Sequence, residues 1–212
     1  FTLVSAPTVS SVAATSGIRG DSVVITGTGF TGASAVTFGT TSATFNVDSA
    51  TQITATVPSG ASNGLNNISV TTVGGTGVGN SLFTVNKTDP VVTATPTAPA
   101  ITYGAALSTA TLGGGSASVA GTFAYASPSV TPGAGTYSAS VVFTPSDTNV
   151  NNTVTFSIDV TVHKATPSIT WATPSAITYG TALSGAQLNA TVSGVGGASL
   201  TGDTEYSPAS GT

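Results

Sequence analysis

Cysteine and methionine are absent from this chain of 212 residues, and charged residues make up only 5% of it. The absence of cysteine is compatible with any redox compartment and leaves a metal ion without thiolate ligands. Lysine and arginine are especially scarce, because Arg19, Lys87 and Lys164 are the three such residues and lie far apart in the sequence. Phosphate binding needs clustered positive charge, so the sequence argues against a nucleic-acid partner.

Long apolar runs are also missing, and the helix formers Glu, Lys, Arg and Leu are scarce. Gly, Ser, Thr and Pro interrupt every apolar run well short of the roughly 20 residues that a bilayer crossing needs, so we expect no membrane insertion. Thr, Val, Ser, Gly and Ala dominate instead, a composition that suits short strands joined by tight turns. Hydroxyl groups must then take the place of charges at the surface, which fits an extracellular or bacterial cell-surface protein better than a cytosolic enzyme.

One sequence signature, Ile-Thr-Tyr-Gly, occurs at residues 101–104 and again at 177–180. The match continues through Ala106-Leu107-Ser108 and Ala182-Leu183-Ser184. A spacing of 76 residues (177 minus 101) indicates two copies of a small domain and not one turn of a solenoid. We predict four segments: 1–6, the last strand of a preceding domain or an N-terminal arm; 7–86, a domain; 87–163, the first copy; and 164–212, a partial second copy.

Residues 7–86 show the alternation that is typical of strands. Gln52–Val57 alternates strictly, which predicts Ile53, Ala55 and Val57 on a core face with hydroxyl groups outside. The expected strands are Thr8–Ala13, Ser22–Thr26, Ala35–Phe38, Ala43–Val47, Gln52–Val57, Asn67–Val73 and Ser81–Val85.

Three motifs in this segment, Val23–Phe30, Ala35–Gly39 and Ser49–Pro58, follow one another in an order that resembles an IPT/TIG domain. That immunoglobulin-like module is shared by plexins, some transcription factors and many bacterial surface proteins. One departure is the charged turn around Gly20, where the family usually has an uncharged, glycine-rich turn.

The clearest strands of the chain lie in residues 87–163. Tyr137–Phe143 and Val154–Val162 each place apolar side chains at alternate positions, and a run of turn formers, Thr144–Asn149, connects them. With the Ile-Thr-Tyr-Gly signature, these features resemble the bacterial Ig-like repeats that occur in tandem in very large secreted proteins. The two resemblances imply an all-β chain of tandem immunoglobulin-like β-sandwich domains in an extended array. The linkers Asn86–Pro90 and His163–Pro167 end in proline, which restricts hinge motion.

Residues 164–212 lack counterparts of Tyr137–Phe143 and Val154–Val162. The partial copy would then have an open sheet edge and an uncovered core. If the protein ends here, a strand from another subunit must supply the missing pairing. The other expectation is that both ends of this sequence fall inside domains of a longer protein.

Catalytic constellations are not evident. The acidic residues are scattered except for Asp203 and Glu205, and His163 is the one histidine, at the end of a predicted strand. No Gly-x-Ser-x-Gly motif joins a strand to a helix. We therefore predict that the chain is not an enzyme and has no cofactor.

Two short motifs have both a local and a functional interpretation. Asp147, Asn149 and Asn151 place oxygen atoms at alternate positions as a calcium loop does, but the loop lacks the expected Gly and closing Glu, and an Asx turn is the simpler reading. Arg19-Gly20-Asp21 is the tripeptide that integrins recognise, which makes it a candidate adhesion site. Gly-Asp before a strand is also ordinary turn chemistry.

Most aromatic residues alternate with small or apolar ones, which favours core packing over a sugar-binding platform. Trp171 is the exception, because its counterpart in the first copy is Ala94, and we treat it as a candidate for stacking on a ligand. The other aromatic residues expected in cores are Tyr103, Phe123, Tyr125, Tyr137, Phe143, Phe156, Tyr179 and Tyr206.

The leading hypothesis is a non-catalytic structural or stalk segment of a bacterial extracellular fibre or surface adhesin. Its partners would be neighbouring domains or subunits of the same protein, with surface glycans and host cells as further candidates. The alternatives are an accessory module of a secreted enzyme, with carbohydrate binding as its candidate activity, and an Ig-like component of a phage virion.

Overall fold

The computed structural model describes residues 4–200, 204–207 and 210–211. Regular structure in these residues is almost entirely β, apart from two short 3-10 helices, η1 (Leu107–Thr109) and η2 (Val195–Gly197). The predicted all-β class is confirmed. No helix among these residues has the length and apolar character needed to cross a membrane. Of the segment predicted at 1–6, residues 1–3 lie outside the described residues, and residues 4–6 have no regular secondary structure.

The chain forms two compact units. The first comprises residues 1–91, 118–121 and 144–154, and the second comprises 92–117, 122–143 and 155–212. The four segments expected from the sequence stay a prediction, as does their extended arrangement.

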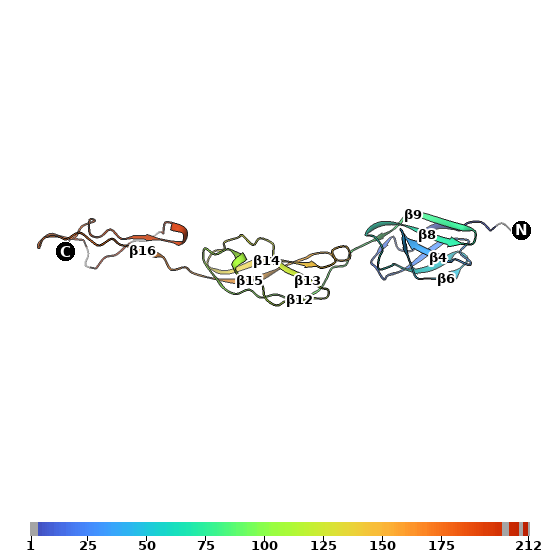
Figure 1. The fold of residues 1–212 in the computed structure, drawn as a ribbon, viewed down its shortest axis with the longest axis horizontal. Helices are drawn as coiled ribbons and strands as arrows, with labels where there is room; N and C mark the ends of the chain where they lie inside the picture. The colour runs from blue at the N-terminus through green and yellow to red at the C-terminus, as the bar shows by residue number, and fades with distance from the viewer. Residues whose placement is uncertain (1–3, 201–203, 208–209, 212) are drawn as a thin grey trace. The chain divides into compact units, whose positions relative to one another are not determined.

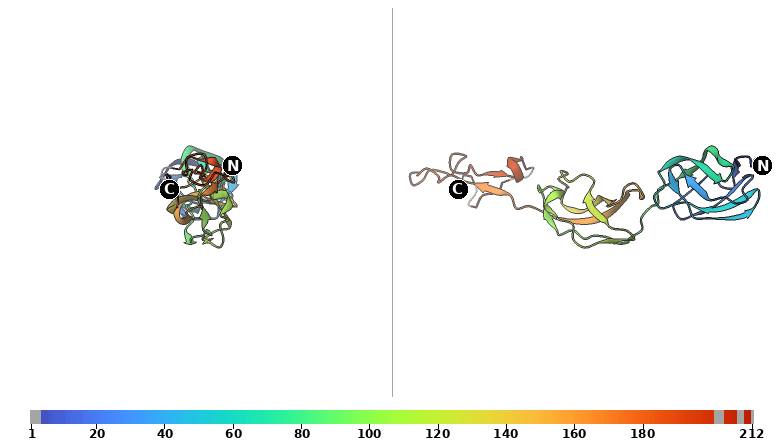
Figure 2. Two further views of the ribbon diagram at one scale, coloured as in Figure 1. Left: turned by 90° about the vertical axis from the view of Figure 1, so that its left-hand side faces the viewer. Right: turned by 45° about the vertical axis from the view of Figure 1, so that its right-hand side comes forward.

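Residues 8–85 form a sandwich of two sheets (Figures 1 and 2). One sheet has the strand order β1 (Thr8–Val12), β3 (Ser22–Thr28), β7 (Gln52–Thr56) and β6 (Phe45–Ser49). The other has the order β2 (Ser16–Gly17), β9 (Gly75–Val85), β8 (Gly64–Thr72), β4 (Ala35–Phe38) and β5 (Thr41–Ser42). All neighbouring strands are antiparallel except β2 and β9, which run parallel.

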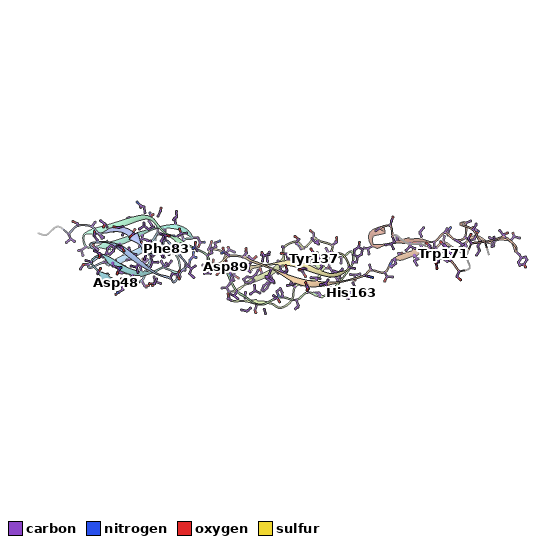
Figure 3. All side chains as sticks on the ribbon, turned by 180° about the vertical axis from the view of Figure 1, so that it is seen from behind. Asp48, Phe83, Asp89, Tyr137, His163 and Trp171 are labelled. Atoms are coloured by element: carbon purple, nitrogen blue, oxygen red, sulfur yellow. The ribbon has the colours of Figure 1, made fainter. Side chains whose placement is uncertain are left out.

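The core of this sandwich lies between the inner faces of the two sheets. Ile53, Ala55 and Val57 are buried as their alternation predicted. Phe83 of β9, labelled in Figure 3, packs edge-on against Phe38 of β4, with ring centroids 5.4 Å apart and ring planes at 87°. Aromatic rings of this size fill the centre of a thin sandwich, and the perpendicular arrangement suits their charge distribution.

Strands of the later residues form separate small sheets. β10 (Val92–Ala94) pairs with β12 (Ser116–Ala117), and a four-stranded sheet has the order β11 (Ile101–Thr102), β15 (Val154–His163), β14 (Gly135–Pro145) and β13 (Gly121–Tyr125). β11 runs parallel to β15. The apolar face predicted for Tyr137–Phe143 is confirmed, and Val160 and Val162 of β15 are buried in the same way.

After residue 164, the described residues hold one two-stranded sheet. β16 (Ser168–Thr170) pairs antiparallel with β17 (Thr191–Ser193). This pair stands at the start of its segment, as the pair of β10 and β12 does in the first copy.

Candidate functional site

Trp171 follows β16 directly and has half of its surface exposed (50%) (Figure 3). Its indole N–H donates a hydrogen bond to the carbonyl oxygen of Gln187 at 2.9 Å. The ring lies edge-to-face with Tyr206, with centroids 5.5 Å apart and planes at 67°. The Tyr206 hydroxyl accepts a hydrogen bond from the Ala190 N–H at 2.9 Å. Both aromatic residues are therefore held by their polar edges, which leaves apolar ring surface available.

A cavity of about 340 Å³ opens beside this aromatic pair. Among the described residues, none of those that line it is charged. Such a cavity can accept an apolar side chain or the face of a sugar ring. Its apolar lining is supplied by Trp171, Pro174, Ile177, Leu183, Leu188 and Tyr206.

Core packing is confirmed for several aromatic residues of the first copy. Phe143 is buried, and Phe123 contacts it with ring centroids 4.9 Å apart and contacts Phe156 with centroids 6.0 Å apart. The same expectation is wrong for Tyr103 and Tyr179, which are 47% and 105% exposed. Each precedes a glycine with positive φ, so the chain turns there and the side chain leaves the core face.

The hydroxyl of Tyr125, on β13, is buried without a hydrogen-bond partner in the described part of the chain. Burial raises the pKa of this hydroxyl above its ordinary value of 10.0, because the phenolate form would lose its hydration. A group that resists ionisation in this way fits a packing role.

The candidate calcium loop lies between β14 and β15. The Asp147 carboxylate oxygen Oδ1 accepts the N–H groups of Asn149 at 2.9 Å and Val150 at 3.2 Å, which is the geometry of an Asx turn. Asn151 is buried, and its Oδ1 accepts the hydroxyl of Thr88 at 2.7 Å. Two of the three proposed ligands thus use an oxygen atom for internal hydrogen bonds. In the described residues, no three His, Asp or Glu side chains gather to hold a metal ion. Calcium binding stays a prediction.

The candidate adhesion tripeptide forms the turn between β2 and β3. The Asp21 N–H donates to the Ile18 carbonyl at 3.2 Å, and Gly20 has a φ of +90°, which favours glycine. The Asp21 carboxylate accepts the Ile18 N–H at 2.8 Å, and Arg19 Nη2 donates to Ala61 O at 2.7 Å and to Asn63 Oδ1 at 2.8 Å. Both charged groups therefore stabilise the loop. Integrin recognition stays a prediction.

The linker predicted at Asn86–Pro90 makes contacts that sequence reasoning missed. Thr88 donates its N–H to Val150 O at 3.0 Å and accepts the Asn152 N–H on its own carbonyl at 2.9 Å. Asn152 Nδ2 donates to the Asp89 carboxylate at 2.7 Å (Figure 3 marks Asp89). In the sequence, the turn formers around Asn149 predicted a loop. They did not indicate that this loop would form hydrogen bonds with Thr88 in the linker. The structure brings two of the three candidate sites together. Arg19, Asp147 and Asn149 line one cavity of about 380 Å³, and Asn63 accepts a hydrogen bond from Arg19 and donates one to the Asn149 carbonyl. Trp171 lies on a different element and does not line this cavity.

Comparison with known families gives one match, the IPT/TIG domain, over residues 7–85. None of the curated proteins matches the chain. Similar solved structures include SGBP-B from a complex xyloglucan utilization locus in Bacteroides uniformis, with 22% identity and a TM-score of 0.34, covering 43% of this chain and 31% of that one.

Two further solved structures have a similar sequence identity and a similar TM-score to this chain. One contains domains CD of another protein, with 19% identity and a TM-score of 0.33, covering 67% of this chain and 56% of that one. The other, with xylogluco-oligosaccharide, has 18% identity and a TM-score of 0.33, covering 68% of this chain and 33% of that one. The chain thus spans less than two thirds of each of these three proteins. Residues 7–85 form an IPT/TIG domain, as the order of their three motifs predicted.

Proposed function

We propose that the chain is a non-catalytic structural segment, a stalk or fibre piece, of a bacterial extracellular or surface protein. The linker at Asn86–Pro90 supplies the observation that carries this proposal. Thr88 uses its N–H, its carbonyl and its hydroxyl in hydrogen bonds to residues 150–152. Pro90 is buried at the end of the linker. A linker whose backbone is bonded on both sides loses most of its conformational freedom, which is what a spacer between domains requires.

Solution scattering from the whole chain tests this proposal. A compact chain of this length would have a radius of gyration of about 17 Å. We expect a clearly larger value and an elongated distance distribution for the wild type. Thr88→Val combined with Asn152→Ala removes the side-chain bonds of the linker and should broaden that distribution.

Thr161→Val provides the matched control, because Thr161 is exposed on β15 away from the linker. We expect its scattering to equal that of the wild type. A compact wild-type particle, or a double variant indistinguishable from the wild type, would count against the spacer function.

A second candidate function is carbohydrate binding as an accessory module, and the half-exposed ring of Trp171 favours it. An exposed indole face can stack on a sugar ring. Calorimetric titration with xylogluco-oligosaccharide is a direct test. Saturable binding that Trp171→Ala abolishes would support this candidate, and absence of heat at millimolar sugar would remove this probe as a ligand.

Adhesion to host cells is a more specific form of the surface role proposed above. If Arg19-Gly20-Asp21 is read by integrins, Asp21→Glu should abolish cell attachment, because the longer side chain displaces the carboxylate. If attachment to the variant equals that of the wild type, the tripeptide is a turn and nothing more.

A further inference from the structure

Asn63 and Gly64 form the one Asn-Gly pair of the sequence. They lie where the loop that follows β7 leads into β8, and Asn63 is exposed. Gly64 has a φ of +84°, and apart from its chain neighbours no atom lies within 4 Å of the place where a Cβ atom would be. Every other asparagine precedes a residue whose side chain crowds the backbone nitrogen, whereas the nitrogen of Gly64 has no such shield.

The side-chain amide of Asn63 bridges two groups. Its Oδ1 accepts a hydrogen bond from Arg19 Nη2 at 2.8 Å, and its Nδ2 donates to the carbonyl oxygen of Asn149, in the loop between β14 and β15. All three residues belong to the same compact unit. The bridge needs an acceptor and a donor on one side chain, which an amide provides and an ionised carboxyl group does not.

The two partners of Asn63 would respond in opposite ways to a carboxylate at this position. Arg19 would gain an ionic partner in place of a neutral one. The Asn149 carbonyl would lose its donor and face a negative charge instead. Asp147 lines the same cavity as Asn63 and adds a second negative charge there. The bond to the loop between β14 and β15 is therefore the one that a carboxylate removes.

We propose that Asn63 is a site of spontaneous deamidation, and that its conversion releases the loop between β14 and β15 from this bridge. The Gly64 backbone nitrogen loses its proton and bonds to Cγ of Asn63. The Cγ–Nδ2 bond breaks, and Nδ2 leaves as ammonia with that proton, which gives a cyclic succinimide. Water then opens the ring at either carbonyl and leaves aspartate or isoaspartate at position 63. Water is the only other reactant.

The isoaspartate product brings a further change, because its main chain passes through the former side chain and gains a methylene group. Asn66 is buried, and its Nδ2 donates to the carbonyl oxygens of Ser62 and Gly64, each at 2.8 Å. These two carbonyls flank the modified residue. A longer backbone between them cannot keep both bonds, so this product should also loosen the start of β8.

Peptide mapping by mass spectrometry, after prolonged incubation of the whole chain at mildly alkaline pH, tests the site. We expect exchange of ammonia for water to accumulate at Asn63 at least about tenfold faster than at Asn149. Asn149 is the internal control, because it is also exposed and lies in a turn but precedes the branched Val150. Asn63→Gln should show no conversion at this position, since attack on its amide would require a larger ring.

Hydrogen exchange measures the release of the loop. The N–H groups of Thr88 and Asn152 form the hydrogen bonds that join the linker to this loop. Asn63→Asp reproduces one product, and we expect both N–H groups to exchange about fivefold faster in it, which corresponds to one lost hydrogen bond. Asn67→Asp is the matched control, because it makes the same charge change on β8 but keeps the hydrogen bond that Asn67 Oδ1 accepts. Its exchange should equal that of the wild type.

Three results would overturn the proposal. Equal conversion of Asn63 and Asn149 would remove the deamidation site. Unchanged exchange in Asn63→Asp would remove the release of the loop. Equal acceleration in Asn63→Asp and Asn67→Asp would show an effect of charge alone. None of these measurements depends on the shape of the chain, so they are separate from the scattering test of the spacer function.

Discussion

Gly27 occupies a position on β3 where no side chain fits. A Cβ atom there would lie 1.9 Å from the Thr8 carbonyl oxygen and 2.5 Å from Cζ of Phe30. The close approach coincides with the irregular register of β1 on β3, between Val9 and Ser11. The glycine thus lets an edge strand bend onto the sheet, as bulges do.

We predict that Gly27→Ala lowers the free energy of unfolding by about 2–4 kcal/mol, because backbone of β1 and a buried ring must both shift. Urea denaturation measures the change. Gly60→Ala is the matched control in the same sandwich, since its nearest neighbour is a Thr41 methyl group at 3.4 Å, and it should be almost neutral. Equal losses in both variants would contradict this account of Gly27.

The buried hydroxyl of Tyr125 leads to a prediction about stability at alkaline pH. Its folded-state pKa is raised by burial, so its contribution to stability is fully present below pH 10 and is lost as pH rises through the folded pKa. We expect Tyr125→Phe to lose less stability than the wild type between neutral and strongly alkaline pH, as measured by thermal melting. At neutral pH the variant should be at least as stable, because the deleted hydroxyl has no partner in the described residues. Parallel pH profiles for the two proteins would refute the effect of burial.

In the loop between β14 and β15, a single side chain, that of Asp147, stabilises the backbone that follows β14. Asp147 bonds two backbone N–H groups, so Asp147→Ala should cost about 1 kcal/mol of stability. Asp159→Ala is the control, because Asp159 is exposed on β15, and it should be neutral. Excess Ca²⁺ should leave the melting temperature of the wild type unchanged. A rise with Ca²⁺ that EDTA reverses, and that Asp147→Ala abolishes, would instead establish the calcium site.

Alternation of apolar and polar residues predicted the longer strands, but it did not predict the two-residue strands. β2 and β5 are too short to show a period of two. β9 begins at Gly75, earlier than Ser81, because glycines that suggested a loop lie inside the strand. Gly77 is required there: a Cβ would lie 2.1 Å from the Pro7 carbonyl oxygen of the adjacent N-terminal segment.

For the candidate site, too, the sequence predicted a single residue but not its contacts with residues distant along the chain. Comparison of the two copies singled out Trp171, because tryptophan replaces Ala94. The carbonyl of Gln187 and the ring of Tyr206 could not be assigned to it, since those contacts cross 16 residues or more of chain.

At the scale of the molecule, each compact unit has its own apolar cluster. Phe38 is fully buried in the cluster of residues 23–85, and Trp171 lies in the other unit. We predict that Phe38→Ala lowers the stability of the first sandwich by about 3–5 kcal/mol. Its transition, followed by circular dichroism, should move to lower denaturant concentration while the transition followed by Trp171 fluorescence stays in place. A common shift of both signals would show that the units unfold together.

Two sheets of the chain contain a parallel pair that joins a short early strand to a later, longer one. Ser16 and Gly17 of β2 lie opposite Thr84 and Val85 of β9, and β11 lies against the end of β15 in the same sense. When tension is applied to the two ends of the chain, the strands of such a pair are drawn past each other lengthwise. Their hydrogen bonds are then loaded simultaneously in shear, whereas a hairpin would unzip one bond at a time. Each such pair is two residues long, so a stretched chain loads only a few hydrogen bonds at this point.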